Sequence, residues 1–139
     1  MISANDYNYD EINLGEVFEF NKILTVQDID DYAALTGDHN PLHCDLDYAR
    51  STEFKNRVVH GMLAGSLFST LVGMVCPGRK NLYLTQSLKF KLPIYPDSEL
   101  TVRGKIIKKV DSLKVIVINT EIIVNGEAVI EGEAKVKII

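Results

Sequence analysis

Residues 58 to 78 read VVHGMLAGSLFSTLVGMVCPG and contain no Asp, Glu, Lys or Arg. The apolar centre of this stretch, Met62 to Val75, is shorter than the about 20 residues that a membrane span needs, and runs of this length are more often buried core helices. The stretch ends at Cys76-Pro77-Gly78, where proline and glycine stop a helix. We therefore expect one central helix over about residues 60 to 75, wrapped by the rest of the chain.

Small residues recur at every fourth position of this helix, namely Gly61, Gly65, Ser69 and Gly73. This spacing places them along one ridge, where a sheet or a second backbone can approach closely. Such spacing also occurs in paired membrane helices. The short length, His60 and the scattered hydroxyls argue against that interpretation, so we expect no membrane partner.

The rest of the chain is dominated by strand patterns. Apolar and polar residues alternate, or β-branched residues gather, over residues 16–24, 82–92, 100–106, 113–124 and 128–138, and Asn125-Gly126 is a hairpin signal. Thr25 and Asp28 form a capping box for a helix that ends at Gly37, and Asp45 caps a short helix through Ala49. Residues 1–15 are expected to form an irregular leader lying over the domain. The pattern predicts an α+β fold, with a long antiparallel β-sheet wrapped around one central α-helix, in a single domain spanning residues 1–139.

A short loop before the central helix carries titratable groups. Asp38, Asn40, Pro41 and His43 fall within six positions. Pro41 fixes its own φ and keeps Asn40 out of the α region, so the backbone turns sharply and holds the acid and the histidine near one space. Together with the Asn40 amide they could add water to a polarised double bond, or remove it. Taken alone, the pattern fits equally an Asx-type turn with a surface histidine.

The start of the central helix offers a second kind of group. The first turn of a helix has free N–H groups and a positive dipole end, and Gly61 lets a ligand carbonyl approach the backbone. This is the requirement for stabilising a developing oxyanion.

Three segments together resemble the MaoC-like R-specific enoyl-CoA hydratases and dehydratases of the hotdog superfamily. They are YAALTGDHNPLHCDLDYA (32–49), RVVHGMLAGSLFSTLVG (57–73) and QSLKFKLPIYPDSEL (86–100). The resemblance implies a hotdog fold, a homodimer and a hydro-lyase that adds water reversibly to trans-2-enoyl-CoA, giving (R)-3-hydroxyacyl-CoA. One departure is the turn at residues 96–98, where many relatives have Gly-Asp.

The resemblance and the chemistry together assign site residues. Asp38 is expected to take a proton from water, His43 to hold the water and supply a proton, and the Gly61 N–H to meet the thioester oxygen. Asn40 would steady the water, and Ser66 matches a family serine that orients the pair. The sequence does not decide which of Asp38 and His43 makes which proton transfer, since the two can titrate as a coupled pair.

Other candidate groups have simpler explanations. A metal site from Asp38, His39 and His43 is disfavoured because the segment contains a proline, so we expect no metal. Cys44 is interpreted as a small semi-buried thiol and His60 as packing at the helix start. Lys89 and Lys91 fit the wet face of a strand. With Arg79 and Lys80 they could instead meet the phosphates of coenzyme A, as weak substrate-binding candidates.

Alternative functions are a (3R)-3-hydroxyacyl-ACP dehydratase, a hotdog thioesterase, and a non-catalytic acyl-CoA binding module. The substrate is then an acyl-CoA or acyl-ACP thioester. A net charge of −4 argues against nucleic acid as a partner. The sequence contains neither a G-x-G-x-x-G motif after a strand nor a P-loop, so we expect no cofactor. The polar start of the chain and the two cysteines favour the cytoplasm.

Overall fold

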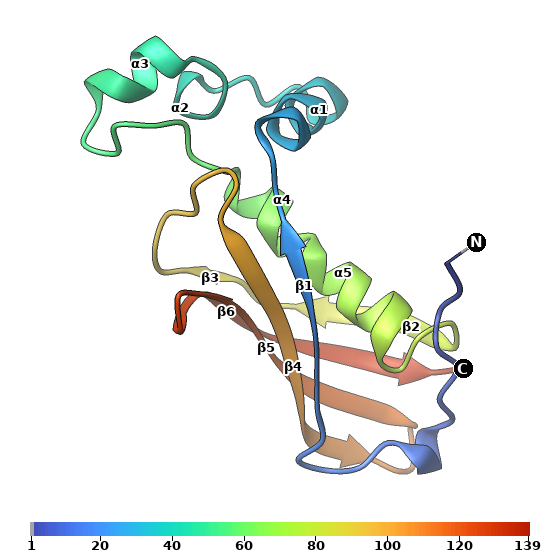
Figure 1. Ribbon diagram of the computed structural model, residues 1–139. Helices are drawn as coiled ribbons and strands as arrows, with labels where there is room; N and C mark the ends of the chain where they lie inside the picture. Colours follow the sequence, from blue (N-terminus) through green and yellow to red (C-terminus); the bar gives the residue numbers. More distant parts are fainter. Residues whose placement is uncertain (1) are drawn as a thin grey trace.

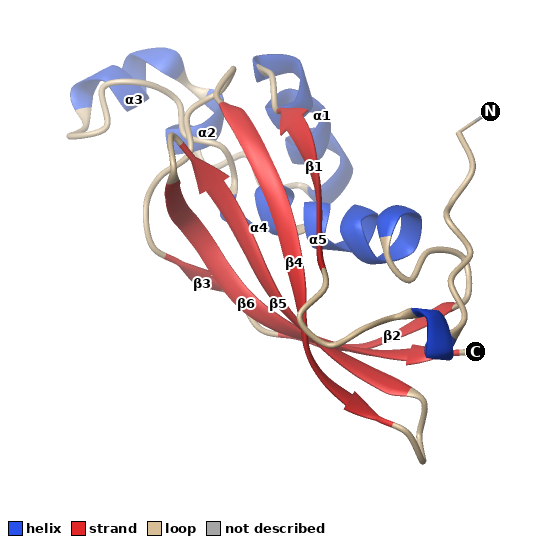
Figure 2. Ribbon diagram, turned by 60° about the horizontal axis from the view of Figure 1, so that its bottom comes forward, coloured by secondary structure: helices blue, strands red, loops and turns tan. Residues whose placement is uncertain are grey.

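The protein is described by a computed structural model that covers residues 2–139. Its strands form one antiparallel six-stranded sheet in the order β1-β4-β5-β6-β2, with β3 also paired to β6 (Figure 2). The strands are β1 (Val17–Ile23), β2 (Asn81–Gln86), β3 (Lys89–Phe90), β4 (Glu99–Val110), β5 (Val115–Val124) and β6 (Glu127–Ile138).

The uncharged stretch forms a helical run that lies in the concave face of this sheet (Figure 1). The run comprises α4 (Gly61–Gly65), α5 (Leu67–Thr70) and the π-helical turn η2 (Leu71–Val75). Ser66 joins α4 to α5 with helical dihedral angles, φ −61° and ψ −19°. The predicted central helix and hotdog fold are therefore confirmed, although the helix is irregular at Ser66 and in its last turn. Among residues 2–139, no helix has the length and apolarity needed to cross a membrane.

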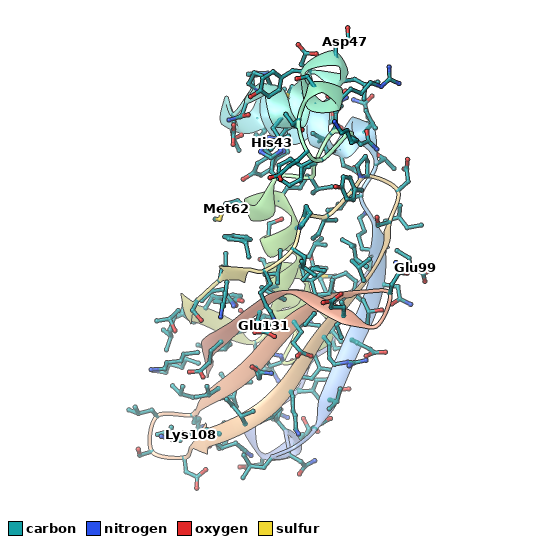
Figure 3. The ribbon with its side chains drawn as sticks, turned by 90° about the vertical axis from the view of Figure 1, so that its left-hand side faces the viewer. His43, Asp47, Met62, Glu99, Lys108 and Glu131 are labelled. Atoms are coloured by element: carbon teal, nitrogen blue, oxygen red, sulfur yellow. The ribbon has the colours of Figure 1, made fainter. Side chains whose placement is uncertain are left out.

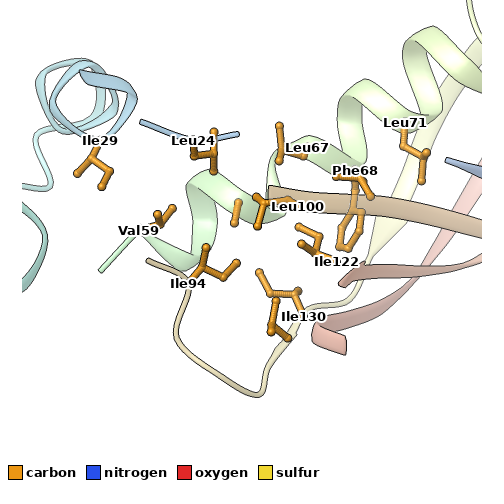
Figure 4. Close-up of a cluster of buried hydrophobic side chains, with 13 residues drawn as sticks. Leu24, Ile29, Val59, Leu67, Phe68, Leu71, Ile94, Leu100, Ile122 and Ile130 are labelled. Atoms are coloured by element: carbon orange, nitrogen blue, oxygen red, sulfur yellow. The ribbon is translucent and has the colours of Figure 1, made fainter. Parts of the chain in front are cut away.

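The central helix is held by apolar contacts with the sheet. Phe68 and Leu71 are almost fully buried and belong to one cluster with Leu100, Ile122 and Ile130 from the strands (Figure 4). Full burial of one such side chain contributes about 1.5–3 kcal/mol. Because the run carries no charge, nearly every inward-facing position contributes to this core.

A second apolar cluster fixes the N-terminal leader. Tyr9, in the 3₁₀ turn η1 (Tyr9–Glu11), and Ile12 pack with Val72 of the helical run and with strand residues such as Ile116 and Val136. The leader also pairs with the end of the helix, where the Asn5 N–H donates to the Met74 carbonyl at 3.0 Å. The described part of the leader therefore lies over the domain, as the sequence predicts, while Met1 lies outside the described residues.

Three further helices gather at the end of the domain where the central helix begins (Figure 1). They are α1 (Val26–Thr36), α2 (Pro41–Cys44) and α3 (Leu46–Ser51). Thr25 and Asp28 form the predicted capping box of α1, and Gly37 ends α1 in the left-handed region. The side chain of Asp45 accepts the Tyr48 N–H at the start of α3, also as predicted. The helix α2, at Pro41, was not predicted.

The predicted strand over residues 82–92 is wrong as one element, because it divides into β2 and β3. The break occurs at Ser87, whose N–H donates to the Glu133 carbonyl while its hydroxyl accepts the Glu133 N–H at 2.9 Å. The side-chain hydroxyl takes the place of a ladder acceptor, so the strand bends there. A glycine, Gly132, lies against this bend in β6.

The predicted ridge of small residues on the central helix faces the segment that joins β2 to β3, but only over the first part of the helix. A Cβ at Gly61 would lie 2.8 Å from the Phe90 ring, and one at Gly65 would lie 3.2 Å from Leu88. The close approach is therefore to the β2–β3 region. A Cβ at Gly73 would have no neighbour within 4 Å, so this glycine does not share the role.

We expect Gly132→Ala to destabilise the fold by about 2 kcal/mol, within the usual cost of overpacking. The added Cβ would lie 1.9 Å from the Ser87 carbonyl oxygen. The backbone must move to relieve this clash. Gly73→Ala is the matched control, since its methyl meets nothing and alanine favours a helix. Urea unfolding should show a lower midpoint for the first variant and an equal or higher one for the second. Equal midpoints for both variants would contradict this account of the bend.

Candidate active site

The loop between α1 and α2 is shaped by its own side chains. The Asp38 Oδ1 accepts the Asn40 N–H at 3.3 Å, and the Asn40 Oδ1 accepts the Leu42 N–H at 3.0 Å. The Asx-type turn considered from the sequence is therefore present. It does not exclude a chemical role, because Asp38 remains exposed and keeps its second carboxylate oxygen available.

His43 is anchored through one ring nitrogen. Its Nδ1 lies 2.6 Å from the Val58 carbonyl oxygen, and because a carbonyl can only accept, Nδ1 carries the proton in the neutral ring. The Nε2 atom is then free to accept or, in the charged ring, to donate. The carboxylate of Asp38 and the ring of His43 place candidate ligand atoms within 4.8 Å of each other. This separation is less than the sum of two hydrogen bonds of about 2.8 Å, so one water can bridge the two groups.

Arg57 fixes the backbone of His43 from behind. Its Nε donates to the His43 carbonyl and its terminal guanidinium nitrogen donates to Asp30 of α1. The guanidinium is buried, whereas Asp30 is about half exposed. Sequence reasoning missed Arg57. A signal was available, because it is the last charged residue before the uncharged stretch.

His60 completes the cluster. Only 2% of this residue is exposed, and its Nε2 lies 2.9 Å from the Asp38 carbonyl oxygen. Its ring stacks on that of His43, with centroids 4.0 Å apart. Burial lowers the pKa of His60, so its ring is neutral at neutral pH. The packing expected from the sequence is confirmed, but the partners are the two proposed catalytic residues.

An apolar cleft of about 470 Å³ opens beside this cluster. Its lining includes His43, Gly61, Phe54, Met62, Phe90 and Leu92. Figure 3 places His43 and Met62 on neighbouring elements at the entrance of the central helix. As the first residue of α4, Gly61 has an N–H without an intrahelical acceptor. The cleft thus combines apolar walls with a histidine and a free backbone donor.

Ser66 is engaged within its helix. Its hydroxyl donates to the Leu63 carbonyl at 2.6 Å, and the residue is exposed on the helical run one turn beyond Gly61. The structure does not bring Ser66 into hydrogen-bond contact with Asp38 or His43, so its orienting role stays a prediction. Asn40 likewise uses its side-chain oxygen to cap α2, which leaves its NH₂ group for a water.

The four basic residues predicted as phosphate contacts fall into two groups. Lys91 lines the cleft and pairs with Glu131 at 2.9 Å, a hydrogen bond that raises the pKa of Lys91, and Lys89 is exposed nearby on β3. Arg79 and Lys80 follow the far end of the helical run, where Lys80 pairs with Asp6 at 3.1 Å. Within one chain, only the first group is close to His43.

A thiol nucleophile and a metal were also considered. Burial raises the pKa of the Cys44 thiol, which disfavours the thiolate that a nucleophile requires. Asp38, His43 and His60 place possible metal ligands within 4.8 Å of one another, so His60 replaces His39 in the set considered from the sequence. The two rings lie nearly parallel, at 27°, and one nitrogen of each is bonded to a backbone carbonyl. In-plane lone pairs of stacked rings do not converge on one ion, so this arrangement fits a metal poorly.

Comparisons with known proteins agree with this geometry. The family model for the MaoC like domain matches residues 11–128. The chain is 37% identical to an (R)-specific enoyl-CoA hydratase of Aeromonas caviae over 80% of this chain and 83% of that protein. It is 36% identical to the corresponding hydratase of Rhodospirillum rubrum, over 86% and 85% of the two chains. The solved structure of the R-hydratase PhaJ1 from Pseudomonas aeruginosa superimposes with a TM-score of 0.93 at 32% identity, covering 97% of this chain and 87% of that one.

Removal of metal ions should leave the activity unchanged. The stacked imidazoles cannot direct lone pairs to one ion at about 2.0–2.1 Å, the usual Zn–N distance. Turnover of an enoyl-CoA, the substrate class in the names of the relatives, after dialysis against EDTA and after dialysis without chelator checks this expectation. Loss of turnover in the chelated sample, restored by adding Zn²⁺, would show that the cluster holds an ion.

Proposed function

Since the chain belongs to the MaoC-like domain family, we propose that it is an R-specific enoyl-CoA hydratase, adding water to trans-2-enoyl-CoA to give (R)-3-hydroxyacyl-CoA. One observation carries the assignment of the chemistry. The carboxylate of Asp38 and the ring of His43 place polar atoms within 4.8 Å of each other, and His43 lines an apolar cleft together with Gly61.

The reaction needs two proton movements around one water molecule. Hydroxide character develops toward the third carbon of the acyl chain, and a proton is delivered to the second carbon. Asp38 takes a proton from the water, while the charged ring of His43 holds that water through its Nε2–H and delivers this proton to the second carbon. The proton left on Asp38 is returned to His43 before the next turnover. The anchored Nδ1 of His43 keeps Nε2 directed away from the Val58 carbonyl. The reverse reaction, dehydration, uses the same two groups in the opposite order.

Negative charge on the thioester oxygen is stabilised by the backbone. The Gly61 N–H is the proposed donor, aided by the positive end of the helical run. The Phe90 ring lies where a side chain on residue 61 would project, so a glycine is required there.

The acyl chain is assigned to the apolar cleft. Its walls of Phe54, Met62, Phe90 and Leu92 offer an apolar surface to the hydrocarbon of the acyl chain. Lys91 lines this cleft, Lys89 lies two residues before it on β3, and both remain the proposed contacts for the coenzyme A phosphates. For Arg79 and Lys80 that role requires a second subunit, because they lie at the other end of the helical run.

The alternative acyl-ACP dehydratase has less support, since the relatives that match over most of both chains are named enoyl-CoA hydratases. Thioester hydrolysis involves no proton transfer to carbon, so it would leave one of the two roles assigned to Asp38 and His43 without a purpose. The cysteines Cys44 and Cys76 are free thiols, and a reducing compartment such as the cytoplasm is the proposed location.

The proposed assembly is a homodimer of a single domain spanning residues 1–139. In the described chain, β2 lies at one end of the sheet order and has a strand partner on only one side. Leu82 and Leu84 on this strand are exposed. An apolar strand edge of this kind is commonly covered by a partner, and joining two β2 strands would extend the sheet across both subunits.

Asp38→Asn and His43→Ala should each lower kcat for crotonyl-CoA hydration by at least about 100-fold, the lower range for loss of a general acid or base. Loss of the enoyl thioester absorbance measures the rate. The product should resist an S-specific 3-hydroxyacyl-CoA dehydrogenase, which reports its R configuration. His39→Ala is the control, since His39 lies in the same loop and is exposed. Near-normal turnover by folded Asp38→Asn and His43→Ala variants would refute the assignment, and release of free thiol would indicate a thioesterase.

Light scattering should give a mass of twice 15.5 kDa for the protein in solution. The double variant Leu82→Lys/Leu84→Lys should shift this mass toward one chain, because lysines on two joined β2 strands would lie side by side on one face of the sheet and repel each other. Leu113→Lys is the matched control, as this leucine is exposed in the turn between β4 and β5. A wild-type mass of one chain would contradict the proposed dimer.

A further inference from the structure

His60 occupies the junction between the catalytic loop and the central helix. It is the residue immediately before α4, and only 2% of its surface is exposed. Its ring lies between two others, with centroids 4.0 Å from His43 and 4.8 Å from Tyr32 of α1. Three segments of the chain therefore meet on one buried imidazole.

The hydrogen bond of His60 fixes the backbone at Asp38. The Asp38 carbonyl oxygen can only accept, so the His60 Nε2 carries the proton that joins them over 2.9 Å. This bond crosses 22 residues and ties the loop to the entrance of the central helix. A displacement of this carbonyl would move the Asp38 carboxylate relative to His43.

The other ring nitrogen of His60, Nδ1, contributes no hydrogen bond to the described fold. Among the described residues, Nδ1 is a buried side-chain atom without a hydrogen-bond partner. An unpaired buried polar atom costs stability, so an apolar side chain would suit this position better for stability alone. A histidine at this cost points to a requirement for its Nε2–H and its flat ring.

We propose that His60 is a positioning residue for the hydration reaction, whose Nε2–H holds the Asp38 carbonyl while its ring supports the ring of His43. This inference rests on the proposed roles of Asp38 and His43. His60 does not itself transfer a proton, because its Nε2 is bonded to a backbone carbonyl and its Nδ1 is enclosed by protein. Burial also lowers the pKa of His60, which keeps a positive charge away from the stacked face of His43.

Three variants separate the hydrogen bond from the ring. His60→Gln retains an N–H donor near the position of Nε2 and removes the flat ring. His60→Phe retains the ring and removes the donor. His60→Met has the length of Gln and neither feature, so Gln and Met form a matched pair. Val72→Ala, in the same helical run but in the second apolar cluster, is the control for loss of stability without change at the site.

The expected order of activity is the reverse of the expected order of stability. Displacing a reacting group by about 1 Å can cost about 100-fold in rate. We therefore expect kcat to fall about 100-fold in His60→Phe and His60→Met, with His60→Gln recovering at least about 10-fold of that loss and KM within about twofold throughout. The apolar variants should be the more stable in thermal unfolding, because Gln leaves a buried polar atom unpaired.

Two results would overturn the proposal. One is kcat within about twofold of wild type in the Phe and Met variants. The other is a loss of kcat that follows melting temperature across all four variants, including Val72→Ala, because this would reduce His60 to a packing role.

Two further measurements distinguish failure of the proposed function from failure of the positioning role of His60. Asp38→Asn is assayed beside the His60 variants, and unaffected turnover there refutes the catalytic assignment, whatever the His60 series shows. A crystal structure of His60→Met then tests positioning without an assay, with an Asp38 carbonyl displaced by about 1 Å expected. An unmoved carbonyl would refute the positioning role.

Discussion

The structure depends on the burial of one uncharged helical run in the concave face of a curled sheet. Residues 61–75 offer no charged group to water, so the run is stable only when strands cover it on several sides. The apolar side chains of β4, β5 and β6 provide this cover, and the leader closes the far end. The direction of the run then fixes where its first N–H groups point, which is toward the loop of residues 37–45.

That loop is held by contacts from outside itself as well as by its own turns. The guanidinium of Arg57 binds the His43 carbonyl, the Val58 carbonyl binds the His43 ring, and His60 binds the Asp38 carbonyl. All three come from the four residues that precede the central helix. The segment that enters the core is therefore the same segment that orders the acid and the histidine. This coupling explains how a short exposed loop can keep two titratable groups at a fixed separation.

Polar groups are distributed unevenly around the site. The cleft walls are mostly apolar, and His43 and Gly61 are part of its lining, while Asp38 and His60 cluster with His43. Such a distribution suits an acyl thioester, because the hydrocarbon is removed from water and the developing charges meet oriented groups. The neutral state of His60 adds to this arrangement, since burial lowers the pKa of His60 and no positive charge is placed against the ring of His43.

The sequence by itself determined the central helix, most strand positions, the caps at Thr25, Gly37 and Asp45, and the residue types needed for hydration. These features follow from local chemistry, namely periodicity, turn residues and the absence of charge. It did not determine the break at Ser87, the helix at Pro41 or the positioning contacts of His60 and Arg57. Those depend on which backbone carbonyls lie within reach, and only the tertiary structure decides that. His60 looked like simple packing because its partners, the Asp38 carbonyl and the His43 ring, are distant along the chain and become neighbours only when the loop folds against the helix start.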